Sequence, residues 1–254
     1  MENKIESGVQ LFSRVTRKTC LEGINPHLLP EGKPCPNQII EIIGDDSQVD
    51  KTNLLIDFIV RCILPVDCNR EWKGSTAILV NTEFQINLFK IIKVIENLLQ
   101  KNQISKPKKH IIKSALKNLI IFNCFNLEEL EVTFHKIEKT IHHNENVSLV
   151  LIDNIATQFW ISKFTDNRLS YYQHSLRIFG LIHDIIKSLQ VVLIFARNEN
   201  ANNKRFSKEV DFRIEIVNGR NDFNAVVTNY ENQSKICVPI KLEPFLEFIN
   251  VSNS

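Results

Sequence analysis

The sequence is poor in several features that define other classes of protein. Its 254 residues contain only seven glycines, and its six cysteines include no C-x-x-C pair. No apolar run approaches the roughly 20 residues that a membrane-spanning helix needs, so we expect no membrane segment. The first ten residues contain acids and no apolar h-region, so we also expect no secretory signal. These absences favour free thiols in a reducing compartment over a disulfide-rich secreted protein.

The chain also lacks a strong excess of charge of one sign. It has 31 basic and 29 acidic residues, a formal net charge of +2, and 43% hydrophobic residues. This balance is typical of a globular protein and excludes disordered, collagen-like and coiled-coil classes. Any binding to nucleic acid must therefore come from a local patch of charge. A chain of this length can bury one large core, so we expect one main domain.

Short apolar runs alternate with segments in which apolar residues recur every three or four positions. Continuous apolar runs of this kind are typical of strands that are covered on both faces, and the striped segments are typical of helices packed on a sheet. The predicted strands are Ile39–Ile43, Ala77–Val80, Leu119–Phe122, Leu149–Ile152 and Val191–Phe195. The alternation predicts an α/β fold with a mostly parallel central sheet flanked by helices.

The C-terminal part has a different pattern. Three short β-type runs, Phe212–Val217, Ala225–Thr228 and Ile236–Leu242, are separated by the turn-forming segments NGRND and NYENQS. This arrangement predicts antiparallel hairpins that extend the sheet.

The N-terminal residues 1–38 are mixed in character and contain four prolines in their later part. We expect an N-terminal arm with a short helix around Val9–Val15, a core over residues 39–249 and a tail over residues 250–254. Leu11, Phe12 and Val15 are candidate anchors for a protein partner. Packing of these three side chains on the chain's own core is an equally good interpretation.

The first predicted strand leads into GDDSQVDKT and then into an apolar helix. Strand, loop, Lys-Thr and helix is the context of a P-loop, in which backbone N–H groups and a lysine bind phosphates and a hydroxyl binds Mg²⁺. Gly44, Lys51 and Thr52 match that pattern. However, five residues rather than four follow Gly44, and Asp50 stands where the second glycine is expected.

The acids of this loop weaken the case for nucleotide binding. Asp45, Asp46 and Asp50 surround the single Lys51. At an effective dielectric constant near 20, one carboxylate about 4 Å from a phosphate charge costs roughly 4 kcal/mol, which approaches a thousandfold in affinity. The alternative interpretation is a surface turn in which Asp50 is the N-cap of the helix.

Two further acids follow predicted strands. Asp153 ends the run SLVLID, and we expect it on the strand beside the loop, where it could hold Mg²⁺ through water. Glu83 follows the run AILVNT and could orient or deprotonate an attacking water. The alternative for Asp153 is a solvated acid at the end of a strand. The alternative for Glu83 is an acid that interacts favourably with the dipole at the N-terminus of a helix.

Two basic segments are also prominent. After the fifth strand, Lys204, Arg205 and Lys208 surround Phe206, a combination that can follow a phosphate backbone and stack a base. The segment Lys101–Lys117 contains six lysines and no acid, which suits phosphates or an acidic partner. A solvated loop and a solvated helix face are the respective alternatives.

The order of GDDSQVDKT, NTE and LVLIDN resembles the core of the RecA-type recombinases. The stretches ESG near the N-terminus, RCILP at residues 61–65 and FWI at residues 159–161 resemble the recombinase paralogues within that family. The resemblance covers roughly residues 6–200.

The resemblance implies a role in homologous-recombination repair of DNA breaks in the nucleus. The implied partners are other recombinase paralogues, the D-type directly and the B and C types in the complex, together with single-stranded or branched DNA. By matching positions, Gly44, Asp50, Lys51 and Thr52 fall on the ATP-binding loop, Asp153 on the Mg²⁺ strand and Glu83 on the catalytic acid. Arg197–Lys208 falls on a DNA-binding loop, with Glu199 where the family carries a glutamine.

Three interpretations of function remain open from the sequence. The first is a paralogue subunit with a degenerate nucleotide site and weak or lost ATP hydrolysis. The second is a working DNA-dependent ATPase that uses ATP and Mg²⁺. The third is a P-loop-derived scaffold that does not act on DNA.

Overall fold

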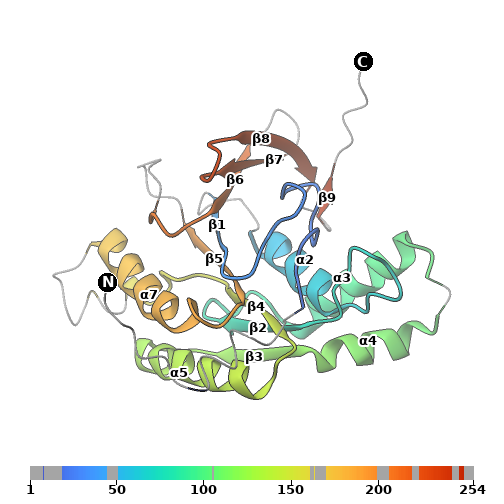
Figure 1. Ribbon diagram of the computed structural model, residues 1–254, viewed down its shortest axis with the longest axis horizontal. Coiled ribbons are helices and arrows are strands. Elements are labelled where there is room, and N and C mark those ends of the chain that lie inside the picture. The colour runs from blue at the N-terminus through green and yellow to red at the C-terminus, as the bar shows by residue number, and fades with distance from the viewer. Residues whose placement is uncertain are drawn as a thin grey trace.

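A central sheet with helices on both faces makes up the computed structural model, which describes residues 8, 19–44, 51–104, 106–160, 163, 170–198, 206–218, 223–241 and 246–248 (Figure 1). Within these ranges the sheet has nine strands in the order β3-β2-β4-β5-β1-β6-β7-β8-β9. The strands are β1 (Ile39–Gly44), β2 (Thr76–Asn81), β3 (Leu119–Asn123), β4 (Val147–Ile152), β5 (Val192–Asn198), β6 (Phe212–Asn218), β7 (Phe223–Asn229), β8 (Lys235–Lys241) and β9 (Glu247–Phe248).

The first six strands of the sheet, in the order β3-β2-β4-β5-β1-β6, are parallel to one another. The predicted α/β class and all five predicted parallel strands are confirmed, and β6 adds a sixth parallel strand beside β1. The helices are α2 (Lys51–Ile63), α3 (Leu88–Lys101), α4 (Lys108–Lys117), α5 (Leu127–His143) and α7 (Tyr171–Ile186). Helices α2, α3 and α4 contribute to the apolar core on one face of the sheet, and α5 and α7 to the core on the other (Figure 1). Because helices cover both faces of the sheet, the parallel strands are apolar at almost every position.

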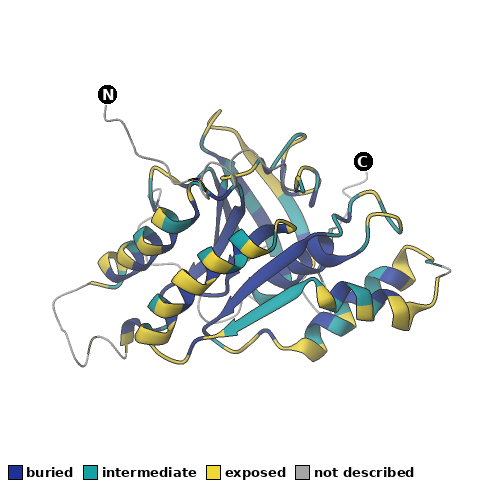
Figure 2. Ribbon diagram, turned by 60° about the horizontal axis from the view of Figure 1, so that its bottom comes forward, coloured by how far each residue is buried: buried dark blue, intermediate teal, exposed yellow. Residues whose placement is uncertain are grey.

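The hairpins at the end of the chain are also confirmed. β6, β7, β8 and β9 pair antiparallel in sequence. Burial declines outward from the alternating pattern of β7 to β8, where most residues are exposed or half-buried (Figure 2). The sheet is therefore well covered in its parallel half and open to solvent in its antiparallel half.

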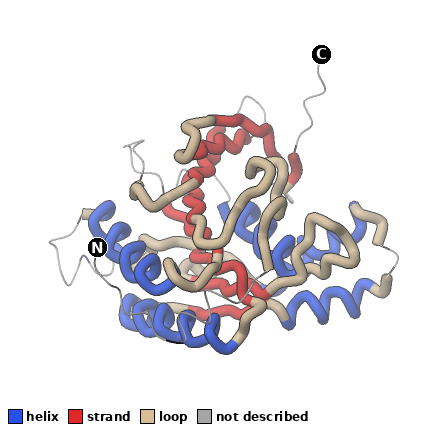
Figure 3. The backbone as a smooth tube through the Cα atoms, viewed as in Figure 1, coloured by secondary structure: helices blue, strands red, loops and turns tan. Residues whose placement is uncertain are grey.

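Residues 19–38 correct the predicted boundary of the N-terminal arm. They form loops and turns (Figure 3), but Leu21, Ile24 and Leu28 are at most 2% exposed and belong to the same apolar core as α2. The Asn25 side-chain amide donates to Asp57 Oδ2 at 3.0 Å, which fixes this segment to α2. The main domain therefore includes these residues. The predicted helix at Val9–Val15 lies outside the described residues.

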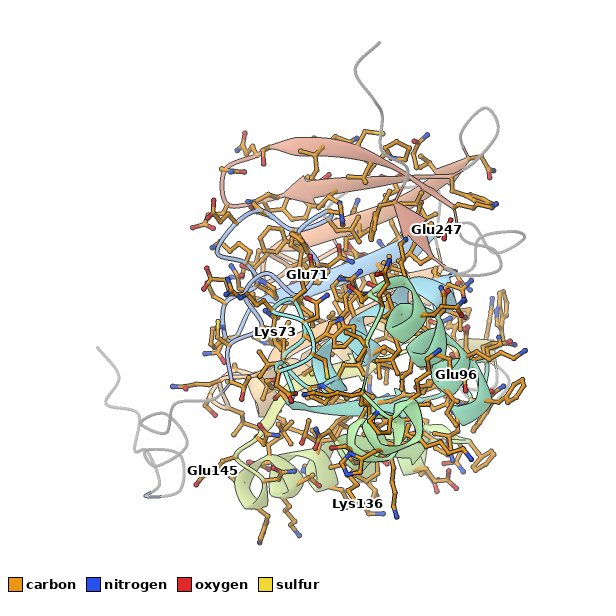
Figure 4. The ribbon with its side chains drawn as sticks, turned by 90° about the vertical axis from the view of Figure 1, so that its right-hand side faces the viewer. Glu71, Lys73, Glu96, Lys136, Glu145 and Glu247 are labelled. Atoms are coloured by element: carbon orange, nitrogen blue, oxygen red, sulfur yellow. The ribbon has the colours of Figure 1, made fainter. Side chains whose placement is uncertain are left out.

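A second anchor joins the same segment to the loop after α2. Arg61 of α2 donates from Nε to Asp57 and from Nη1 to Glu71, both at 2.8 Å. Lys73 Nζ donates to the Glu22 carbonyl oxygen, and Glu71 and Lys73 lie in this loop region in Figure 4. None of the described helices is long and apolar enough to cross a bilayer.

Candidate functional site

The candidate nucleotide residues lie where the parallel strands end. Gly44 is the last residue of β1, and α2 begins at Lys51. Since the carboxyl ends of parallel strands share one edge, the ends of β2, β4 and β5 lie along this edge as well. Gly44, Lys51 and Thr52 thus lie at the carboxyl edge, and their role in binding nucleotide stays a prediction. Asp50 lies outside the described residues.

The ammonium group of Lys51 is held by the neighbouring strand. Lys51 is 9% exposed, and its Nζ donates to Asn198 Oδ1 at 2.7 Å. Asn198 is the last residue of β5 and is in register with Gly44. The contact therefore ties the start of α2 to the end of β5. Asn198 was not recognisable as this partner before the structure, because an asparagine at a strand end is common.

The strand of Asp153 is not beside β1, which corrects the sequence interpretation. β4 pairs with β2 and β5, and β5 lies between β4 and β1. Asp153 and Lys51 therefore share the edge of the sheet, but the strands that precede them, β4 and β1, are not adjacent. The end of β5, with Asn198, lies between them.

The carboxylate of Asp153 is held by four donors. Its Oδ1 accepts from the Thr82 N–H at 2.7 Å, the Thr82 hydroxyl at 2.7 Å and the Asn154 N–H at 2.9 Å, and its Oδ2 accepts from the Glu83 N–H at 3.0 Å. The residue is 2% exposed. Burial raises the pKa of this carboxyl, while the four hydrogen bonds act in the opposite direction. Asp153 thus fixes the start of the loop after β2.

Glu83 belongs to the same cluster. Its Oε1 accepts a hydrogen bond from the side-chain amide of Asn154. The Thr82 hydroxyl also lies 2.9 Å from the hydroxyl of Thr157. The structure therefore brings Glu83 and Asp153 together, and it adds Thr82 and Asn154, which the sequence analysis missed. Within the described ranges, no group of three His, Cys, Asp or Glu residues is arranged to hold a metal ion.

A buried ion cluster supports the same edge from within the sheet. Glu41, in the middle of β1, is 0% exposed and accepts from Arg197 Nε at 2.5 Å and from Arg213 Nε at 2.8 Å. The three residues join β1, β5 and β6. The Arg197 guanidinium also lies 4.9 Å from the ring centroid of Phe206. A single glutamate in an otherwise apolar strand was the signal that could have revealed this cluster.

The predicted DNA-binding residues are divided by the structure. Phe206 is 1% exposed and packs against Phe179 and Phe195, each at 5.6 Å between ring centroids. A base-stacking role for Phe206 does not fit this placement, and Arg197, at 5% exposed, is committed to Glu41. Lys208 is exposed, with 89% of its side chain accessible.

The remaining members of two predicted sites cannot be placed. Lys204, Arg205 and Glu199 of the basic loop, and Leu11, Phe12 and Val15 of the N-terminal arm, lie outside the described residues. Their DNA-binding and partner-binding roles stay predictions.

The chain is 24% identical over 176 residues to the DNA repair protein XRCC2 of Mus musculus, and the match covers 68% of this chain. This chain resembles mouse XRCC2. The match spans 59% of the length of XRCC2, and no family model matches the chain. The mostly parallel sheet with C-terminal antiparallel strands is consistent with the RecA-like fold that the resemblance to XRCC2 implies.

Proposed function

We propose that this chain is a recombinase-paralogue subunit that supports homologous-recombination repair of DNA double-strand breaks in the nucleus. The resemblance to a DNA repair protein over 68% of the chain is the observation that carries the proposal. The fold supports it, because the stretch of roughly residues 6–200 that resembles the recombinase core contains five of the six parallel strands described, β1 to β5. The proposed partners are the D-type paralogue directly, the B and C types in the complex, and single-stranded or branched DNA.

The nucleotide site of this subunit is proposed to be degenerate. Lys51 and Thr52 at the start of α2 suit the phosphates of ATP. The Asp153 carboxylate does not suit an additional Mg²⁺ water shell, because four donors already occupy it and the loop after β2 depends on it. Glu83 is likewise bonded to Asn154. The polar side chains of the edge thus support the fold, and we derive no hydrolytic step from them.

Purification of the chain with candidate paralogues, followed by a nucleotide-content assay, tests both parts of the proposal. We expect a stable complex containing the D-type paralogue. We also expect that the Lys51→Ala variant of this chain leaves the nucleotide content of the complex unchanged. Failure of every paralogue to co-purify would contradict the assembly role. Loss of one nucleotide per complex on Lys51→Ala would instead favour the active ATPase.

DNA binding separates the proposal from a scaffold that does not act on DNA. Binding of the complex to an oligothymidylate should fall steeply with salt, because phosphate contacts release counterions. Neutralising Lys204 and Arg205 should weaken it, since these are basic residues of the predicted loop. Binding that is absent, or that does not respond to these two substitutions, would favour the scaffold.

A further inference from the structure

Helix α4 carries a group of lysines that the proposed function does not use. Of the six lysines in Lys101–Lys117, two have partners: Lys101 lies 4.0 Å from Glu247, and Lys106 is paired with Asp67. Among the residues that the structure describes, the other four, Lys108, Lys109, Lys113 and Lys117, form no salt bridge. All four are exposed. The helix lies at the periphery of the molecule, next to the edge strand β3 (Figure 1).

The lysines are arranged with apolar side chains in two parallel rows. Lys109, Lys113 and Lys117 are spaced by four residues and lie on one side of the helix, beside the half-buried pair Ile112 and Leu116. These five residues line a groove of about 400 Å³. Ile111 and Ala115 are buried in the chain's own core, and Ile112 and Leu116 pack partly against the same core. The outward side of α4 therefore combines the exposed lysines with the half-buried side chains of Ile112 and Leu116.

The stability of α4 itself does not explain this pattern. Its first turn contains Lys108 and Lys109 and no acid, and its N-cap, Pro107, makes no side-chain capping bond. Positive charge at a helix N-terminus and like charges four residues apart both oppose helix formation. An external group of negative charge would relieve both effects.

We propose that the outer face of α4, formed by Lys109, Ile112, Lys113, Leu116 and Lys117, docks an acidic amphipathic helix of a protein partner. The lysine row complements a row of carboxylates. The row of Ile112 and Leu116 complements apolar side chains spaced by three or four residues. A nucleic acid fits less well, because the groove offers aliphatic rather than aromatic side chains and therefore no platform on which bases stack.

Fluorescence anisotropy with defined probes tests this proposal on the purified full chain. The probe is a synthetic helical peptide of about 16 residues, long enough to cover the roughly 15 Å of α4. It carries leucines along one side and glutamates beside them. A second peptide has the same composition with the leucines placed around the whole helix, and an oligothymidylate is the nucleic-acid probe.

We expect the amphipathic peptide to bind at least about tenfold more tightly than either other probe. The double substitution Lys113→Glu with Lys117→Glu should weaken its binding by about tenfold or more, and Ile112→Ser with Leu116→Ser should weaken it as well. The matched control is Lys136→Glu with Lys139→Glu on the exposed side of α5, where Lys136 is labelled in Figure 4; it should change binding less than about twofold. Circular dichroism checks that each variant is folded, and the lysine pair alone decides the result if the serine pair unfolds.

Three results would overturn the proposal. Equal binding of the peptide with scattered leucines would show attraction by charge alone. Equal or tighter binding of the oligothymidylate would assign the surface to nucleic acid. Binding of the amphipathic peptide that is absent, or that does not respond to the lysine substitutions, would exclude this face as its site.

Discussion

The carboxyl edge of the sheet and the outer face of α4 use charged side chains in opposite ways. At the edge, Asp153 accepts four hydrogen bonds and Lys51 donates to Asn198. On α4, Lys109, Lys113 and Lys117 form no salt bridge within the described ranges. A charge that is bonded within the chain contributes to the fold, whereas an exposed charge without such a bond is available to a partner. The residues at the carboxyl edge therefore match a nucleotide-binding motif in the sequence, while their side chains bond to other parts of the chain in the structure.

The buried glutamate behind the edge should give the largest effect. The substitution Glu41→Gln removes the carboxylate to which the buried side chains of Arg197 and Arg213 both donate. We expect the free energy of unfolding to fall by about 3–5 kcal/mol in urea titrations. Glu96→Gln, on the exposed side of α3 (Figure 4), is the matched control and should stay within about 0.5 kcal/mol. A loss at Glu41 no larger than that of the control would contradict a structural role for the cluster.

Asp153 should follow with a smaller effect. In Asp153→Asn the new amide places a donor where the carboxylate accepted from the N–H groups of Thr82, Glu83 or Asn154. We expect a loss of about 2 kcal/mol in the free energy of unfolding, since at least one buried N–H group loses its acceptor. The exposed Glu145→Gln, also on a loop next to β4 (Figure 4), provides the control. An Asp153→Asn variant as stable as the native chain would mean that the carboxylate is available for another role.

The buried His174 should make the stability of the protein depend on pH. It lies in α7, it is 2% exposed, and its Nε2 has no hydrogen-bond partner among the residues that the structure describes. Burial, and secondarily the charge of Arg177, lower its pKa below the usual 6.5. The unfolded chain therefore binds more protons than the folded chain as the pH falls below 6.5, and stability is lost in that range and fully present above it.

Urea titrations at several pH values measure this contribution. One histidine gives a slope of at most about 1.4 kcal/mol per pH unit, and His174→Gln should remove that part of the slope. Identical slopes in the native chain and in His174→Gln would contradict the assignment.

The lysines of α4 should show the smallest effect on folding. Lys113→Glu combined with Lys117→Glu removes no salt bridge within the described chain, and it relieves repulsion between like charges in the helix. We expect the free energy of unfolding to change by less than about 0.5 kcal/mol, measured as for Glu41→Gln. A loss above about 1 kcal/mol would show that these lysines support the fold, which would remove the contrast with the edge.

The fold was predictable because continuous apolar runs such as Leu149–Ile152 occur where helices cover both faces of a sheet. The position of Lys51, Glu83 and Asp153 along one edge of the sheet followed from the direction of the parallel strands alone. Their partners did not follow, since Asn198 and Thr82 are ordinary residues at strand ends and their contacts depend on register.

Two errors have a common cause. Phe206 has basic neighbours in the sequence, which suggested an exposed loop, yet its ring fills a space between Phe179 and Phe195 from distant segments. Residues 19–38 are irregular, as their prolines indicated, and Leu21 and Leu28 are nevertheless buried. Local patterns report regular structure better than they report burial, because burial is decided by distant parts of the chain.

The most direct test of the degenerate nucleotide site is repair of double-strand breaks in cells that lack this chain and express Lys51→Ala in its place. Immunoblotting checks that the variant and the native chain are present in equal amounts. Survival after break-inducing treatment should be close to that of cells with the native chain, because the proposal assigns Lys51 a contact with Asn198 and no essential contact with ATP. Survival as low as that of cells without the chain, at equal abundance, would contradict the account and assign Lys51 an essential part in nucleotide use.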